Sequence, residues 1–239
     1  MGWAGRDRNV GIESILPKTL FEIGGIPIKD TVVHAWLVTA VLLGLAAWVR
    51  NKFRAWEPEK WQLALETVVA YVEKLIIGAG GRPLPQVVSY LTTMISFIAI
   101  ANLLGLFPGL KTPTRDLNAT AALALVSLGS WQFFSIGKRG FKGYLRSFIE
   151  PNAIMLPFIL LGQFTRTLAM ALRLFGNVMA GEMIGGIVFM LLPVLAPLPF
   201  YLISSLMGVL QALVFTALTI AFIIDATGSE EETTPAAQE

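Results

Sequence analysis

Cysteine is absent from this chain of 239 residues, and histidine occurs once, as His34. Without cysteine the chain has no disulfide, no thiolate nucleophile and no cysteine metal site. Because no second histidine or acid cluster accompanies His34, we expect an interfacial residue there and neither a metal site nor a cofactor. The sequence also contains no internal repeat and no low-complexity tract.

Charge is scarce as well. Charged residues make up 14% of the chain, against about 25% in an ordinary soluble domain. The net charge of +2 is too small to indicate a nucleic-acid partner. Hydrophobic residues make up 55%, and the mean hydropathy is +0.68. The composition therefore predicts an integral membrane protein with several spans.

Five apolar runs are long enough to cross a bilayer, which takes about 20 helical residues. A further helix at residues 57–78 carries Glu59, Glu66 and Glu73 on one face and apolar residues on another. This pattern is typical of an amphipathic helix lying at the membrane interface, and the alternative is a helix docked on a soluble domain. The predicted fold class is an all-α integral membrane protein with one interfacial helix and five transmembrane helices, at residues 31–49, 84–110, 117–137, 151–192 and 199–224.

Basic residues indicate the orientation. The loops after residues 49 and 137 hold clusters of lysine and arginine, whereas the opposing loops hold only Lys111 and Arg115 or no charge. By the positive-inside rule the clustered side is cytoplasmic. We therefore expect an extracytoplasmic N-terminal segment (1–30) that is too charged for a secretory signal peptide. A membrane domain (31–225) and an acidic, disordered cytoplasmic tail (226–239) follow.

The last two apolar runs are too long for upright helices. Residues 151–192 would measure about 60 Å as one helix, and residues 199–224 about 39 Å. The hydrocarbon core is only about 30 Å thick. The first run is therefore either strongly tilted or broken. Two neighbouring helices that are both longer than the bilayer requires indicate a tilted helical hairpin that lies against a curved partner.

Arg173, in the middle of the longest apolar run, is the most informative polar residue. A charge at mid-bilayer costs about 2.5–3.5 kcal/mol, so its presence indicates function. At about 100° per residue, Glu182 lies on the opposite face of the helix from Arg173. The stripe that contains the arginine consists of Gln163, Arg166, Arg173 and Asn177, and the last helix has a polar face of Ser204, Gly208 and Gln211.

A fixed cation and a titratable acid on different faces suit two offset half-channels separated by an electrostatic gate. Arginine stays protonated in proteins, so Arg173 would attract a mobile carboxylate from another subunit and stop protons crossing directly. Glu182 would line a water-filled route from outside. Plainer roles stay open: Arg166 snorkelling to headgroups, Gln211 joining helices by a hydrogen bond, and Glu182 as a paired structural acid.

The segment from Arg173 to Glu182, Arg-Leu-Phe-Gly-Asn-x-x-Ala-Gly-Glu, resembles the signature of subunit a of the rotary F-type ATP synthase. Four further matches occur in the family's order, and the resemblance covers residues 31–225. They are Asn102-Leu-Leu-Gly-Leu-Phe-Pro-Gly109, Asp116-Leu-Asn-Ala-Thr120, Phe148-Ile-Glu-Pro151 and Gln211-Ala-Leu-Val-Phe-Thr-Ala-Leu-Thr219.

This resemblance implies a non-catalytic stator subunit of the membrane-embedded Fo motor. It would pack against a rotating ring of c subunits whose mid-membrane carboxylates carry protons. Arg173 would be the gate, Asn177 and Gln211 would hold it, Glu182 would line the outer half-channel, and Asp116 would lie at its mouth. The implied partners are the c-ring, the subunit b stalk and the remaining subunits of the membrane and soluble sectors, in a bacterial plasma (inner) membrane.

The sequence departs from the family pattern at two places. Ser204 stands where some members carry a histidine that faces the glutamate, and Gly162-Gln163 stands where some carry an acid. Water must then conduct more of the way, or Glu182 works without a partner. The alternatives are sodium in place of protons, a stand-alone secondary transporter, which would usually show paired repeats, and a purely structural anchor for the ring.

Overall fold

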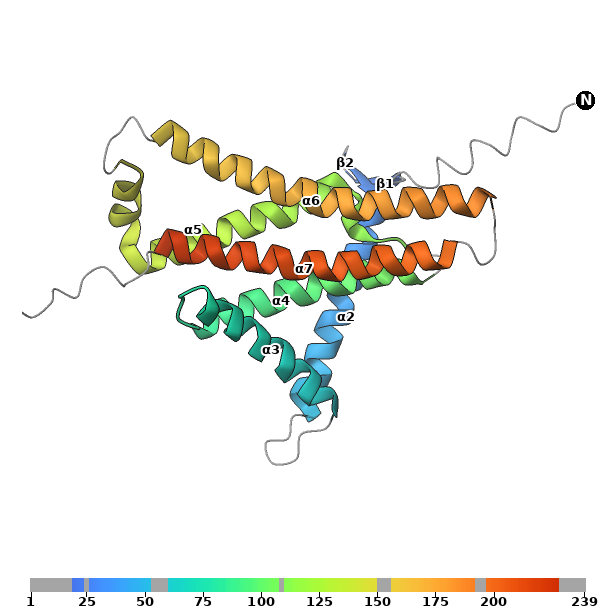
Figure 1. Ribbon diagram of the computed structural model, residues 1–239, viewed down its shortest axis with the longest axis horizontal. Helices are drawn as coiled ribbons and strands as arrows, with labels where there is room; N and C mark the ends of the chain where they lie inside the picture. The colour runs from blue at the N-terminus through green and yellow to red at the C-terminus, as the bar shows by residue number, and fades with distance from the viewer. Residues whose placement is uncertain are drawn as a thin grey trace, which may run out of the picture.

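The computed structural model describes residues 19–23, 26–52, 60–107, 110–149, 156–191 and 197–227. The predictions for residues 1–18 and for the tail beyond residue 227 lie outside these ranges. The described chain consists of helices, with one small β-hairpin near its start (Figure 1). The helices are α2 (Asp30–Lys52), α3 (Lys60–Gly78), α4 (Pro85–Leu103), α5 (Leu117–Ile149), α6 (Leu156–Leu191) and α7 (Pro197–Thr227), with 3-10 turns η1 (Leu104–Leu106) and η2 (Pro113–Arg115).

Five of these helices are long and apolar enough to cross a membrane, which confirms the predicted fold class. α3 does not belong to this set, and its position at the membrane interface stays a prediction. The candidate spans are Asp30–Lys52, Pro85–Leu106, Leu117–Lys138, Leu156–Met190 and Leu198–Asp225.

The helix ends follow ordinary sequence signals. α2 has Asp30 in its first turn and Arg50 and Lys52 in its last, charges that interact favourably with the helix dipole. α4 begins with Pro85, whose missing N–H is not needed in the first turn of a helix. Gly80 follows α3 with φ at +80°, the left-handed conformation that glycine readily adopts after a helix.

The β-hairpin is a feature that we did not predict from the sequence. Strands β1 (Thr19–Ile23) and β2 (Ile26–Lys29) pair antiparallel immediately before α2. Two apolar stretches separated by Gly24-Gly25 are a recognised hairpin signal, and the signal was available. The hairpin matters because of its position. β2 leads directly into α2, so Lys29 lies at the start of the first span.

The third candidate span ends at Lys138, next to its predicted end at residue 137, but the helix that contains it continues. α5 extends to Ile149, but its backbone leaves helical geometry at Gly140, where φ is +71° and ψ is +160°. Glycine tolerates this conformation because it has no Cβ. The portion of α5 after Gly140 takes a different direction from the portion before it (Figure 1).

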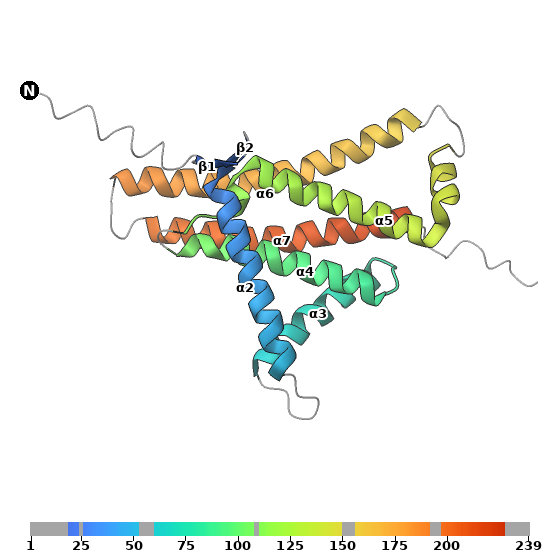
Figure 2. The same cartoon turned by 180° about the vertical axis from the view of Figure 1, so that it is seen from behind.

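Within the described residues, the longest apolar run forms one unbroken helix from Leu156 to Leu191. α6 contains 36 residues, about 54 Å at 1.5 Å per residue, and α7 contains 31. α2 runs steeply across the common direction of α4, α5, α6 and α7 (Figures 1 and 2). These helices therefore cannot all stand upright in one bilayer. Of the two readings of the long run, a tilt and not a break fits the structure.

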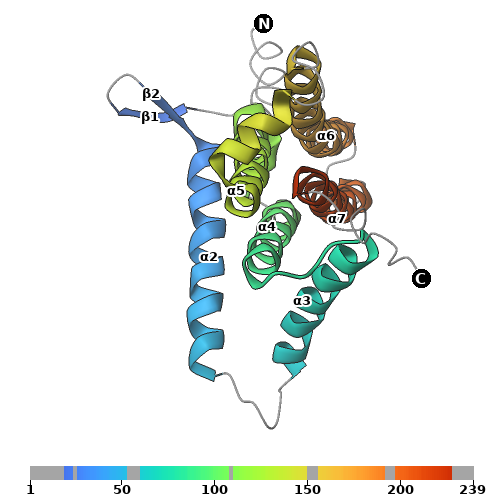
Figure 3. The same ribbon diagram turned by 90° about the vertical axis from the view of Figure 1, so that its left-hand side faces the viewer.

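α4, α5, α6 and α7 form the packed body of the protein. α6 packs against α5 and α7, and α7 also packs against α4 and α5. α3 packs against α4, and α2 contacts α4 and η2 (Figure 3). Only three residues of α2 are buried, Asp30, Thr31 and Val38. Most of α2 is therefore available to lipid or to another chain.

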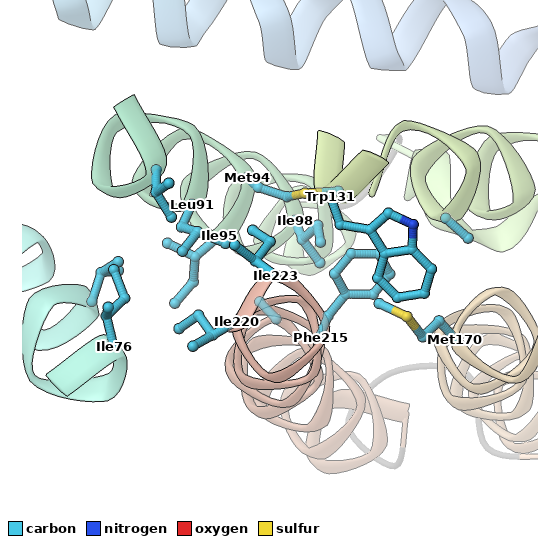
Figure 4. Packing of buried hydrophobic residues seen from close by; sticks show 14 of the residues in the cluster. Ile76, Leu91, Met94, Ile95, Ile98, Trp131, Met170, Phe215, Ile220 and Ile223 are labelled. Atoms are coloured by element: carbon cyan, nitrogen blue, oxygen red, sulfur yellow. The ribbon is translucent and has the colours of Figure 1, made fainter. Parts of the chain in front are cut away.

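The apolar core lies between α3, α4, α5, α6 and α7 (Figure 4). Trp131 of α5 meets Phe222 of α7 edge to face, with ring centroids 4.7 Å apart. Ser127 and Thr219 form a buried hydrogen bond of 2.9 Å between the same two helices, a common contact between helices in lipid. Labelled members of the core are Ile76, Leu91, Met94, Ile95, Ile98, Trp131, Met170, Phe215, Ile220 and Ile223.

Candidate polar site between the last helices

Arg173 lies midway along α6, and its side chain is exposed. The residues at the next position and one turn later, Leu174 and Val178, are buried in the body. The two acids of α6 and α7 pair elsewhere, Glu182 with Arg115 and Asp225 with Arg166. Within the described residues, Arg173 thus presents a cation on the outer surface of the body with no acid bound to it.

Asn177, one turn after Arg173, connects α6 to α7. Its Nδ2 donates a hydrogen bond of 2.9 Å to Oε1 of Gln211. Gln211 is buried, and its Nε2 has no hydrogen-bond partner in the described part of the chain. Buried polar groups usually have partners, so this amide has an unused donor beside the arginine. The two amides therefore join the helices at the level of Arg173.

The other members of the predicted stripe lie nearer the N-terminal end of α6. Arg166 Nη1 lies 3.4 Å from Oδ2 of Asp225 in α7, and both side chains are more than half exposed. Arg166 also lies over the ring of Phe222, 5.3 Å from its centroid. Gln163 instead faces α5, where its Oε1 accepts a hydrogen bond of 3.2 Å from Gln132. The contact between Asp225 and Arg166 was not predicted from the sequence.

A buried ion cluster lies towards the other end of α6. Arg115 of η2 has a side chain that is 1% exposed, and its Nη2 lies 2.6 Å from Oδ2 of Asp30, the first residue of α2. Lys111 lies 3.3 Å from the same carboxylate oxygen. We call this group the Arg115 cluster; its members are Lys29, Asp30, Lys111, Arg115, Asp116 and Glu182.

Glu182 belongs to this cluster through Arg115. Its Oε2 lies 3.7 Å from Arg115 Nη1, and its side chain is 19% exposed. Thr112 hydrogen-bonds to the same carboxylate through its side chain and its backbone N–H. Glu182 also lines a small, partly open cavity of about 10 Å³, roughly the room that one water molecule needs, and Ser204 of α7 lines it as well. The remaining lining residues are Asn102, Gly105, Thr112, Val178, Tyr201 and Ser205.

Asn102, at the end of α4, joins the segments that surround this cavity. Its Nδ2 donates to the carbonyl oxygen of Gly208 in α7 at 3.0 Å, and its Oδ1 accepts from the Thr114 hydroxyl at 2.7 Å. A Cβ on Gly208 would lie 2.6 Å from Cβ of Asn102. Glycine at position 208 thus lets α4 and α7 approach closely enough for the hydrogen bond.

Asp116 fastens the start of α5 to the start of α2. Its Oδ2 lies 3.0 Å from Nζ of Lys29 and accepts a hydrogen bond from the Thr31 hydroxyl at 3.1 Å. Burial raises the pKa of Asp116, but the Lys29 ammonium, the Asn118 backbone N–H and the Thr31 hydroxyl outweigh it and hold that pKa below its usual range. Asp116 is therefore a fixed anion and is suited to fastening two elements rather than to carrying protons.

Sequence reasoning missed the members of this region that lie far from α6 in the chain. Arg115 and Lys111 were noticed only as loop charges, and Asp30 was assigned to the N-terminal segment. The available signal was an arginine flanked by Pro113 and Asp116 in a short loop between two spans. The pairing itself could not be read from periodicity, because Asp30 and Arg115 lie 85 positions apart.

Residues 32–224 match the family described as ATP synthase A chain. A protein of Nitrosospira multiformis named ATP synthase subunit a is 35% identical over 89% of this chain and 85% of its own length. Proteins named ATP synthase subunit a 2 from Picosynechococcus sp. and Bradyrhizobium sp. are 38% and 39% identical, over 86% and 88% of this chain and 88% and 94% of their own lengths.

Proposed function

This chain belongs to the family of ATP synthase subunit a, an integral membrane component of the Fo sector with a stator role, and on that premise we propose that it provides two offset half-channels. Through them protons would reach and leave mid-membrane carboxylates on a rotating ring of c subunits. The chain itself makes and breaks no bond, and nucleotide chemistry belongs to the soluble sector.

The observation that carries this proposal is the exposed guanidinium of Arg173. A cation midway along a membrane helix is costly unless something satisfies it, and the described acids of α6 and α7 are paired elsewhere. Carboxylates supplied by the c subunits would pair with Arg173 one at a time as the ring turns. Because arginine keeps its proton, Arg173 would stabilise the ionised carboxylate and block direct passage of protons.

Glu182 and the cavity beside it support an outer half-channel. The carboxylate is partly exposed, and the cavity is lined by hydroxyl and amide groups that can hold water, including Thr112, Ser204 and Asn102. Asn177 and Gln211 lie between this cavity and Arg173 along α6 and α7. We assign them the role of keeping the route polar up to the arginine.

The inner half-channel would open near the exposed pair of Arg166 and Asp225, with Gln163 beside it. This assignment places the C-terminal end of α7 on the cytoplasmic side and the N-terminal segment outside, in agreement with the basic loops. The membrane potential supplies about 2.3 kcal/mol per charge per 100 mV, and the offset between the two routes would convert it into rotation.

The proposed partners are the c-ring along the exposed face of α6, the subunit b stalk and the remaining subunits, in a bacterial inner membrane. Sodium is the alternative coupling ion, because ion choice is usually set by the site on the c-ring. ATP-driven transport in proteoliposomes with and without sodium distinguishes the two. A strict requirement for sodium would contradict proton coupling.

The chain lacks cysteine, so single cysteines report on single positions. Ala169 and Ala180 are exposed and lie on the Arg173 face of α6, at helical offsets of −4 and +7. Ala169→Cys and Ala180→Cys should each form a disulfide with a cysteine placed beside the c-subunit carboxylate. Leu43→Cys on α2, which is 66% exposed, is the matched control. Cross-linking from Leu43→Cys alone would contradict the proposed interface.

A further inference from the structure

We propose that Arg115 is the positioning residue for Glu182: it holds the Glu182 carboxylate at the cavity between α6 and α7 and sets the pH range over which that carboxylate exchanges protons. The inference rests on the proposed outer half-channel and assigns a second arginine to it. Arg173 would act on carboxylates brought by the ring, whereas Arg115 would act on the fixed acid along the entry route.

The two contacts of the Arg115 guanidinium differ in kind. The contact with Asp30 is 2.6 Å, a short charge-assisted hydrogen bond. The contact with Glu182 is 3.7 Å, too long for a hydrogen bond. Arg115 is therefore anchored by Asp30 and acts on Glu182 through its charge. The guanidinium therefore does not occupy Glu182 Oε2 with a hydrogen bond.

The balance of charge in the Arg115 cluster points the same way. Three cations, Lys29, Lys111 and Arg115, face three carboxylates at distances between 2.6 and 3.7 Å. Asp30 and Asp116 are each held in at least one contact of 3.0 Å or less, and Glu182 has the longest contact of the set. A proton on Glu182 would remove the negative charge that faces Arg115 Nη1. The charge of Arg115 therefore opposes protonation of Glu182.

The groups that face Glu182 leave Arg115 as its main charge partner. The charged or titratable neighbours are Arg115 and Lys111 from the segment after α4 and Tyr201 from α7. Lys111 lies 3.3 Å from Asp30, and Tyr201 contributes a neutral phenol at physiological pH. Ser204 and Ser205, which line the same cavity, do not ionise. Among the described residues, Arg115 is thus the fixed cation that lies nearest to Glu182.

The test measures passive proton conductance of the intact membrane sector in liposomes against the pH of the outer side. Glu182→Gln identifies the part of the profile that depends on Glu182. Arg115→Gln should move that part to higher pH by about one unit, because a carboxylate that loses a neighbouring cation binds its proton more readily. Lys29→Gln, which removes a cation paired with Asp116 instead, should move it far less.

Three further variants guard against simple loss of folding. Asp30→Asn with Arg115→Gln removes the anchor and the cation together, so that neither is left buried without the other, and it should show the same shift. Glu182→Asp shortens the acid and draws it away from Arg115 without touching the anchor, and its profile should also move to higher pH. Arg115→Lys, which keeps the positive charge, should restore most of the wild-type profile.

The outcomes separate this inference from the proposed function. If Glu182→Gln leaves conductance unchanged, Glu182 is not on the route and the outer half-channel is wrong. If Glu182→Gln slows conductance but the profiles of assembled Arg115→Gln and Glu182→Asp stay in place, the role of Arg115 is wrong and the half-channel stands. A shift that persists when Arg115→Gln is added to Glu182→Gln would also contradict action through Glu182.

Discussion

Two arginines in one membrane domain occupy opposite environments, and the contrast explains what each can do. Arg115 is buried and forms an ion pair with Asp30, so its positive charge is compensated within the chain. Arg173 is exposed, and within the described residues no acid is bound to it. A charge that is satisfied internally organises the fold, whereas one that is left on the surface of a membrane helix is available to another chain.

The amide pair beside Arg173 yields a prediction at this scale. Gln211→Leu removes the acceptor for Asn177 Nδ2, a hydrogen bond of 2.9 Å. Such a hydrogen bond contributes about 0.5–1.5 kcal/mol. If the bond holds the side chains in the geometry of the rate-limiting step, its loss corresponds to a fall of roughly 2- to 10-fold in the rate of ATP-driven proton pumping. Asn177→Ala should give a similar fall, and the double variant should be no worse than either. Fully additive losses would show that the two amides act separately.

Asp116 gives a prediction about pH. Its pKa is held below the usual range, so the stability it adds is present above the unfolded value of about 3.9 and is lost as the pH falls through the lower folded value. Asp116→Asn should therefore lower the melting temperature of the solubilised complex by a constant amount from pH 8 to pH 5. The difference should shrink only below about pH 4. A difference that already disappears near pH 6 would mean that Asp116 titrates there.

At the scale of elements, close approach of helices depends on particular glycines. Gly208→Ala would place a Cβ 2.6 Å from Asn102 Cβ and separate α4 from α7, at a cost of about 1–3 kcal/mol for overpacking. A Cβ on Gly129 of α5 meets nothing within 4 Å, so Gly129→Ala is the matched control. Thermal melting of the complex should show a lower midpoint for the first variant alone. Equal midpoints would contradict the packing argument.

The sequence predicted helices better than the contacts between them. Apolar runs of sufficient length located all five candidate spans, because length and hydropathy are local properties. The bend in α5 at Gly140 was missed, since nothing local distinguishes that glycine from others inside helices. The Arg115 cluster was missed for a different reason: it is assembled from β2, α2, η2 and α6, and its partners are distant in the chain.

For the site, periodicity placed Asn177 on the stripe that contains Arg173, and the resemblance grouped it with Gln211; the structure joins the two amides. Helical periodicity also placed Glu182 on the opposite face from Arg173. Periodicity could not identify Arg115 as the neighbour of Glu182, because Arg115 lies outside that helix. Because position 204 is serine, the sequence predicts that either water conducts more of the way or Glu182 works without a partner. The structure instead provides a cation from the loop before α5.

At the scale of the whole molecule, the helices run along two different directions. α2 crosses the common direction of α4, α5, α6 and α7 (Figures 1 and 2), and it is fastened to them where Asp30 meets Arg115. α6 and α7 are both longer than an upright span requires. Under the proposed function, tilted α6 and α7 would present a long surface to the ring of c subunits.

The central claim is that Arg173 couples ion flow to rotation by acting on a partner's carboxylate. The most direct test is ATP synthesis by the reconstituted complex carrying Arg173→Ala, with copurification of the c subunits as the measure of assembly. The account predicts that assembly persists while coupled synthesis is abolished. Synthesis at the wild-type rate in an assembled Arg173→Ala complex would contradict it.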